Sequence, residues 1–277
     1  MPWRPRMSDA PKPVTTLDLL KMKAAGTRIV MLTCYDALFA RLLDAAGIDI
    51  LLVGDSVNQV LGGAESTLSA TLEQMIYHTR IVRRGTRRAL VVCDMPFLTY
   101  QVTREDAIRN AGRAMAQTGC HAVKVEGGVH IAPTVRALVE VGIPVMGHIG
   151  LTPQSLHALG GARVQGRDDV AAQRLKNDAT ALQEAGAFAV VLELVPAALA
   201  REITQSLTIP TIGIGAGPSC DGQVLVLHDM LGLNEEFNAK FVKQYAQLAG
   251  EVRRAAGAFA EEVRAGRYPG PEHSLQK

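Results

Sequence analysis

The sequence predicts an α/β protein whose fold is a (β/α)8 (TIM) barrel, with one helix before the barrel and extra helices at the C-terminal end. Eight short, β-branched apolar runs alternate with longer helix-like stretches along the chain. The length of 277 residues also suits this fold, which typically needs about 250 residues. An open, doubly wound parallel sheet is the structural alternative.

The strand candidates are nearly continuous apolar runs, as expected for parallel strands that helices cover. In chain order they are Arg28–Cys34, Ile48–Val53, Ala89–Cys93, Ala122–Val125, Pro144–Gly147, Phe188–Leu192, Thr211–Ile214 and Gln223–Leu227. Glycines follow most of the helix-like stretches, as is usual just beyond a helix end. The expected helices are Thr16–Ala25, Asp36–Ala46, Thr71–Arg84, Arg104–Thr118, Ala132–Val141, Asp169–Ala185 and Pro196–Ser206.

Two parts of the chain depart from a regular barrel. Gly215–Gly222, between the last two strands, is too short for a covering helix, and further helices are expected after Phe237. Residues 1–14 hold four prolines and no apolar segment like that of a secretory signal. We therefore expect residues 1–14 to be a flexible tail, with Met1 or Met7 as the first residue, and residues 15–277 to be one catalytic barrel domain.

The composition excludes several classes of protein. Hydrophobic residues make up 48% and charged residues 20%, which is typical of a globular chain and not of a disordered one. The formal net charge of +2 gives little attraction for nucleic acid or anionic lipid. No run approaches the roughly 18 apolar residues of a membrane span. Four dispersed cysteines indicate buried thiols in a reducing compartment, so we expect a cytoplasmic protein.

Polar residues follow almost every predicted strand, where a barrel enzyme carries its active site. A helix cap or a turn is the simpler interpretation of any one of them, and Asp36 and Asp229 suit that interpretation. So many polar strand ends together are harder to explain in that way. The residues are Tyr35, Asp36, Asp55, Ser56, Asp94, Lys124, Glu126, His148, Glu193, His228 and Asp229.

Three of these residues are acids that we expect to converge. Side chains two residues apart on a strand share a face, so Asp55 should follow Leu51 and Val53 into the barrel interior. The same spacing brings Asp94 and Glu126 to that surface. Unpaired carboxylates repel one another, and a divalent cation removes the repulsion; oxygen-only ligands favour Mg²⁺ over Zn²⁺. The alternative is that lysine and arginine side chains pair with these acids.

Glu193 closes the apolar run Val190-Val191-Leu192. Burial disfavours an ionised carboxyl group and raises its pKa towards the range of a general base. A metal ion and a separate carboxylate base together suggest removal of a proton next to a carbonyl group.

At these residues the sequence resembles the ketopantoate hydroxymethyltransferase family from about Thr16 to Ser274. The number and order of the shared segments make this resemblance specific. They are Thr33-Cys34-Tyr35-Asp36, Val53-Gly54-Asp55-Ser56, Tyr77-His78-Thr79, Asp94-Met95-Pro96-Phe97, Val123-Lys124-Val125-Glu126-Gly127-Gly128, Gly147-His148-Ile149-Gly150-Leu151-Thr152-Pro153-Gln154, Val164-Gln165-Gly166-Arg167, Leu192-Glu193, Gly213-Ile214-Gly215-Ala216-Gly217, Asp221-Gly222-Gln223, His228-Asp229, and Glu272-His273-Ser274.

The resemblance implies a barrel of the phosphoenolpyruvate mutase and isocitrate lyase group, a homodecamer and a Mg²⁺-stabilised enolate. It implies transfer of a one-carbon unit from 5,10-methylenetetrahydrofolate to 3-methyl-2-oxobutanoate, which gives 2-dehydropantoate for pantothenate biosynthesis. By motif, the Mg²⁺ site is Asp55, Asp94 and Glu126, with Glu126 acting directly or through a water. The keto-acid contacts are Asp55, Ser56, Asp94 and Lys124, and Glu193 is the proton acceptor.

Some roles stay open at this point. His148 is expected at the mouth, where it positions the enolate or relays a proton, with a purely structural role as the alternative. A glycine-rich loop carrying Arg163 and Arg167 is expected over the mouth, where its arginines would meet the carboxylates of folate. The competing functions are a related C–C lyase or mutase that ignores folate, and a barrel that binds without catalysis.

Overall fold

The computed structural model describes residues 12–275 and contains eight parallel strands that pair in sequence order into a closed barrel. The prediction of a (β/α)8 barrel is confirmed, and the open sheet is excluded. The strands are β1 (Ile29–Thr33), β2 (Ile50–Val53), β3 (Leu90–Asp94), β4 (Ala122–Glu126), β5 (Val145–Gly150), β6 (Ala189–Glu193), β7 (Thr211–Ile214) and β8 (Gly222–Leu225). Most of residues 1–14, the predicted tail, lie outside the described residues.

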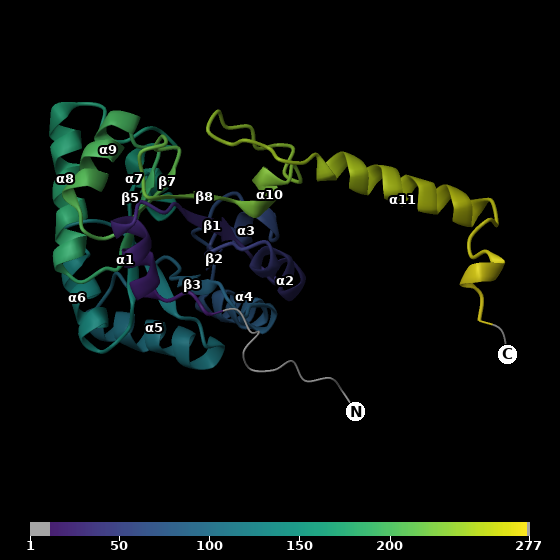
Figure 1. The fold of residues 1–277 in the computed structure, drawn as a ribbon, viewed down its shortest axis with the longest axis horizontal. Coiled ribbons are helices and arrows are strands. Elements are labelled where there is room, and N and C mark those ends of the chain that lie inside the picture. The colour runs from purple at the N-terminus through teal and green to yellow at the C-terminus, as the bar shows by residue number, and fades with distance from the viewer. Residues whose placement is uncertain (1–11, 276–277) are drawn as a thin grey trace. The chain divides into compact units, whose positions relative to one another are not determined.

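The expected helices are present and lie around the strands (Figure 1). They are α1 (Thr16–Ala24), α2 (Ala37–Ala45), α4 (Leu72–Gly85), α5 (Arg104–Thr118), α6 (Ala132–Glu140), α8 (Asp169–Glu184) and α9 (Ala197–Ser206). Three short elements were not predicted: α3 (Val57–Val60), the 3-10 turn η1 (Pro153–Ser155) and α7 (Leu156–Leu159). No helix lies between β7 and β8, as the sequence predicts.

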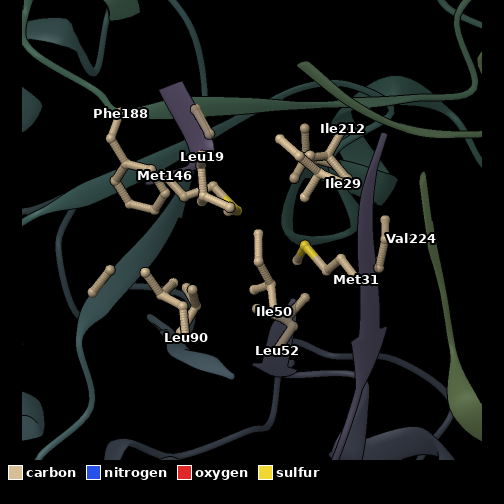
Figure 2. Packing of buried hydrophobic residues seen from close by; sticks show 14 of the residues in the cluster. Leu19, Ile29, Met31, Ile50, Leu52, Leu90, Met146, Phe188, Ile212 and Val224 are labelled. Atoms are coloured by element: carbon tan, nitrogen blue, oxygen red, sulfur yellow. The ribbon is translucent and has the colours of Figure 1, made fainter. Parts of the chain in front are cut away.

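Apolar side chains from all eight strands fill the interior of the barrel (Figure 2). On β2 the interior residues are Ile50 and Leu52, whereas Leu51 and Val53 do not belong to this cluster. The predicted interior face of β2 was therefore wrong by one residue. Asp55 does not continue an inward-facing series; it lies beyond the strand, which ends at Val53.

The amino-terminal end of the barrel is closed by the segment that contains α1. Thr15 and Asp18 form a reciprocal capping box at the start of this helix, which fixes where it begins. Val14 and Leu19 join the interior cluster, and Val14 N donates a hydrogen bond to the Arg88 carbonyl at 2.8 Å. Val14, which the sequence analysis assigned to the tail, is thus part of the folded core.

The described chain divides into two compact units, the barrel up to Leu225 and a second unit from Val226 onward. The second unit holds α10 (Leu227–Met230), α11 (Leu248–Arg264) and the 3-10 turn η2 (Pro271–His273). The eighth strand was predicted to run to Leu227, with His228 and Asp229 at its end. It stops earlier because Leu227 begins α10, so both polar residues belong to a helix of the second unit. That residues 15–277 form one domain stays a prediction.

Two further expectations concern the kind of protein. Within residues 12–275, no helix combines the length and apolar character that crossing a bilayer requires. All four cysteines are buried and carry free thiols, as their dispersed positions predict.

Candidate active site

The carboxyl ends of parallel strands meet at one mouth of a closed barrel, and the predicted site residues gather there. Asp94 is the last residue of β3, and Glu193 is the last residue of β6. Between these strands, Lys124 and Glu126 lie on β4 and His148 lies on β5. The strand register aligns Asp94 with Lys124 and Glu126 with His148.

Lys124 connects the acids of neighbouring strands. Its Nζ donates a hydrogen bond to Asp94 Oδ1 at 2.8 Å and lies 3.7 Å from Glu126 Oε1. All three side chains are almost fully buried. The alternative in which a lysine pairs with the acids is therefore partly realised, because Lys124 is inside the acidic cluster.

Asp55 and Ser56 reach the mouth from the turn after β2. The backbone N–H of Asp55 donates to Asp94 Oδ2 at 3.3 Å, which joins the β2 and β3 ends. The hydroxyl of Ser56 lies 2.8 Å from the Tyr35 hydroxyl, on the segment that follows β1. The site residues thus extend over the ends of six consecutive strands, β1 to β6.

His148 lies between two glutamates. Its Nδ1 is 3.3 Å from Glu126 Oε1, and its Nε2 is 3.2 Å from Glu193 Oε2. Both ring nitrogens and Glu126 Oε1 are buried and have no aligned hydrogen bond to a described residue. Glu193 is more accessible than its neighbours, with 18% of its side chain exposed. His148 therefore joins the acidic cluster to Glu193, the predicted base.

Burial and like charge make this cluster electrostatically strained. Burial, followed by the charges of Asp94 and Glu126, raises the pKa of Asp55 well above its usual range. Burial also raises the pKa of Asp94, although Lys124 opposes this shift. Burial alone would lower the pKa of Lys124, but the surrounding carboxylates outweigh it and raise that pKa. The protein thus holds more negative charge here than Lys124 alone balances.

Around His148, the neighbouring charges outweigh the effect of burial on the pKa. Burial and the charge of Lys124 favour neutral imidazole, but contacts with Glu126 and Glu193 outweigh them and raise the pKa of His148 to about 9. The pKa of Glu126 is lowered, because His148 and Lys124 overcome the effect of burial. The two glutamates therefore favour the protonated form of His148, which would offset part of the negative charge.

The structure shows two site residues that the sequence analysis did not assign a role. Gln154, in η1, donates its side-chain amide to Asp55 Oδ2 at 2.9 Å and its backbone N–H to Glu126 Oε2 at 3.0 Å. Tyr100 accepts a hydrogen bond from the Glu126 backbone N–H at 2.9 Å. The available signal was the position of Gln154 at the end of a motif that follows β5; nothing in the sequence pattern connected it to Asp55.

Other expected residues lie elsewhere. Asp36 caps α2, accepting hydrogen bonds from the backbone N–H groups of Leu38 and Phe39, as the simpler interpretation held. In the loop before α8, Arg163 donates to the Gly160 carbonyl and no carboxylate pairs with it among the described residues. The backbone N–H of Gln165 donates to the Leu194 carbonyl at 2.8 Å, which attaches this loop directly beside Glu193.

The acids fit a hard cation by their donor chemistry. Within residues 12–275, no three His, Cys, Asp or Glu side chains form a ready cage of ligands. Mg²⁺ needs no such cage, because it is usually held by one or two carboxylates and completes its shell with water and substrate oxygens. Glu126 Oε1 accepts no aligned hydrogen bond, and burial with neighbouring acids raises the pKa of Asp55, so a divalent cation would suit this donor set.

Comparison with known proteins supplies the family. The model of the ketopantoate hydroxymethyltransferase family matches residues 13–271. The chain belongs to this family. A Pelobacter propionicus protein named 3-methyl-2-oxobutanoate hydroxymethyltransferase is 55% identical over 97% of this chain and 100% of its own length. A Heliobacterium modesticaldum protein of the same name is 57% identical over 95% of this chain and 96% of its own length.

Solved structures that resemble this family member support the fold alone, because their sequence identity is low. A 2,3-dimethylmalate lyase of the PEP mutase/isocitrate lyase superfamily matches with a TM-score of 0.59 and 18% identity, covering 94% of this chain and 93% of its own. A phosphonopyruvate hydrolase, in complex with oxalate and Mg²⁺, matches with a TM-score of 0.60 and 13% identity, covering 95% and 92%.

Proposed function

We propose that the chain transfers a one-carbon unit from 5,10-methylenetetrahydrofolate to 3-methyl-2-oxobutanoate, forming 2-dehydropantoate for pantothenate biosynthesis. The observation that carries this proposal is the gathering of the family's acidic, lysine and histidine side chains at one mouth of the barrel. The overall balance consumes one water and releases tetrahydrofolate. The full-length similarity to relatives named for this activity supports the same conclusion.

The keto acid would bind beside the positive groups of the mouth. We assign its carboxylate to Lys124 Nζ and to the Ser56 hydroxyl, which are a charged donor and a neutral donor. Asp55, Asp94 and Glu126 would hold Mg²⁺, with Glu126 acting directly or through a water. When bound, Mg²⁺ would polarise the keto group and lower the cost of forming its enolate.

Glu193 is the proposed base. Its carboxylate lies at the end of β6, partly accessible from the mouth, and would take the proton from C3 of the keto acid. His148 Nε2 lies 3.2 Å from Glu193 Oε2 and can orient this carboxyl group. C3 then forms a carbon–carbon bond to the methylene carbon that folate carries. Both carbon–nitrogen bonds of that methylene group break overall, water supplies the hydroxyl oxygen, and tetrahydrofolate leaves.

The loop before α8 is the proposed contact for folate. It carries Arg163 and Arg167, and its attachment to Leu194 places part of it next to the residue after Glu193. Neutralising both arginines should raise KM for the folate while leaving KM for the keto acid unchanged. An unchanged KM for the folate would remove this assignment.

We also propose a homodecamer. In α11, no residue is buried within the described chain, and Val252, Phe259 and Val263 are exposed at spacings that share one helix face. An exposed apolar face of this kind supports self-association. Light scattering in solution tests the assembly directly, and a monomeric mass would contradict it.

The decisive experiment follows loss of deuterium from C3-labelled 3-methyl-2-oxobutanoate, with and without Mg²⁺ and folate. We expect Mg²⁺-dependent exchange without folate, and 2-dehydropantoate only when folate is present. Exchange followed by cleavage or rearrangement would favour the lyase or mutase alternative. Binding without exchange would favour a barrel that does not catalyse.

Glu193→Gln should lower C3 exchange by about 100-fold or more, because the amide cannot accept the proton. Binding of the keto acid, measured by calorimetry, should change little. Glu202→Gln is the matched control, since Glu202 is an exposed glutamate on α9 that pairs with Lys176. Exchange at the wild-type rate in Glu193→Gln would transfer the role of base to another group.

A further inference from the structure

Gln154 contacts the acidic cluster from the loop after β5. Only 5% of the residue is exposed, and it lies in the short 3-10 turn η1. Its side-chain Nε2 donates to Asp55 Oδ2 and to the Met95 carbonyl, each at 2.9 Å. The residue thus connects the segments that follow β2, β3 and β5.

The orientation of the Gln154 amide is fixed from its other side. Its Oε1 accepts hydrogen bonds from the Tyr100 hydroxyl at 2.7 Å and from Gln101 Nε2 at 3.0 Å. The two N–H groups and the carbonyl oxygen of the amide are therefore all engaged. A flipped amide would turn Oε1 towards Asp55 Oδ2, so that two acceptors would repel each other. Tyr100 and Gln101 hold the amide in the orientation that Asp55 needs.

The backbone of the same residue acts on a second acid. Gln154 N donates to Glu126 Oε2 at 3.0 Å, whereas Glu126 Oε1 lies 3.3 Å from His148 Nδ1 and 3.7 Å from Lys124 Nζ. One residue therefore engages one oxygen of Asp55 and one oxygen of Glu126. Gln154 therefore restrains how both carboxylates are turned.

We propose that Gln154 is a positioning residue for the divalent cation, because its donors to Asp55 Oδ2 and Glu126 Oε2 fix the orientation of two of the acids that would hold the ion. This inference rests on the proposed Mg²⁺ site of the transferase. It extends that site to a neutral residue that touches neither the ion nor the keto acid. Second-layer contacts of this kind commonly change metal affinity by about 10- to 100-fold.

The test measures Mn²⁺ binding to the full chain by the paramagnetic resonance signal of free Mn²⁺, in the absence of substrates. Gln154→Met keeps the length of the side chain and the backbone N–H but removes the amide. We expect Mn²⁺ affinity to fall about 10-fold while the melting temperature of the metal-free protein stays within a few degrees. Gln173→Met, a substitution of a glutamine on the outer helix α8, is the matched control and should bind Mn²⁺ like the wild type.

A second variant keeps the test decisive if Gln154→Met does not fold. Gln101→Met removes a donor to Gln154 Oε1 without removing a contact to Glu126, and it should also weaken Mn²⁺ binding. Wild-type affinity in the folded variants, or a lower melting temperature with unchanged affinity, would overturn the inference. If wild-type protein does not bind Mn²⁺, or Asp94→Asn binds as well as wild type, the proposed metal site itself fails. Wild-type binding that Asp94→Asn weakens and Gln154→Met does not would refute the role of Gln154 alone.

Discussion

The two ends of the barrel both contain partly or fully buried charges, but they balance those charges differently. At the amino-terminal end, Asp221 accepts hydrogen bonds from Lys23 Nζ and from the backbone N–H of Thr211, both at 2.8 Å. At the mouth, Asp55 and Asp94 lie together and each has a raised pKa. Asp221 therefore has a lysine of its own, whereas at the mouth Asp94 and Glu126 share Lys124, which suits the proposed ligand site.

A second acid at the amino-terminal end follows the same rule. Asp44 accepts hydrogen bonds from three successive backbone N–H groups, those of residues 87–89. Arg88 in turn pairs with Asp49 at 2.7 Å. These paired acids suit the usual division of a barrel between a stabilising end and a catalytic end.

The largest expected effect comes from substituting an acid at the mouth of the barrel. Asp94→Asn should reduce activity by about 100-fold or more and weaken Mn²⁺ affinity by at least about 10-fold, because it removes a proposed ligand. The free energy of unfolding should change by less than about 2 kcal/mol, since the lost pairing with Lys124 is offset by relief of repulsion from Glu126. Steady-state kinetics and denaturant titration measure both quantities.

Asp106→Asn serves as the control for Asp94→Asn, because Asp106 lies on the exposed start of α5. It should leave activity and Mn²⁺ affinity unchanged. A large loss of stability in Asp94→Asn with normal Mn²⁺ affinity would assign this acid to the fold instead of the site.

The next largest effect comes from substituting an acid at the amino-terminal end of the barrel. Asp221→Ala should lower the free energy of unfolding by about 2–3 kcal/mol, because Lys23 and the Thr211 N–H lose their acceptor in a largely buried place. The turnover number of the folded protein should stay unchanged. Glu73→Ala, which removes an exposed pair with Arg113, should cost less than about 1 kcal/mol. Equal costs for the two variants would contradict the contrast between the two ends.

The smallest effect concerns pH. Burial, followed by the charge of Arg83, lowers the pKa of His121 to about 4, and its Nδ1 accepts a hydrogen bond from Val91 N. Between about pH 4 and the ordinary histidine value of about 6.5, the unfolded chain binds a proton that the folded chain does not. Stability should therefore fall as pH decreases through this interval.

His121→Asn can keep the hydrogen bond and removes the titration. Between pH 7 and pH 5, the variant should lose less unfolding free energy than wild type does. The difference should be only about 1 kcal/mol, because His121 is partly exposed. Denaturant titrations at both values measure the difference. His157→Asn, a change in an exposed histidine, should behave like wild type. The same pH dependence in His121→Asn and wild type would show that this ring does not contribute.

The sequence allowed most of the barrel and much of the site to be predicted, for physical reasons. Buried parallel strands are recognisable in the sequence as apolar runs. On β3 and β4, the two-residue alternation of side chains correctly brings Asp94, Lys124 and Glu126 to one surface. The alternation failed for Asp55, because β2 ends two residues earlier and the turn, not the strand, directs this side chain. The alternation of side chains therefore predicts the direction of a residue only within the strand, not in the turn that follows it.

Gln154 marks the limit of such reasoning. It is separated by 99 residues from Asp55 and by 28 from Glu126, and it contacts them from a short turn without periodicity. A neutral side chain after a strand gives no sign of which acid it meets. The end of β8 was missed for a similar reason, since the apolar Leu227 fits a strand and a short helix equally well.

The absence of a helix between β7 and β8 has a consequence for where the pairing of the strands frays. These two strands share only two register pairs, Ile212 with Gly222 and Gly213 with Gln223. On the other edge of β8, Val30 aligns with Gln223, and both side chains are exposed. Because few pairs join β7 to β8 and the other edge of β8 carries exposed side chains, transient fraying should begin at β8, and its amide protons should exchange with solvent before those of β3 and β4.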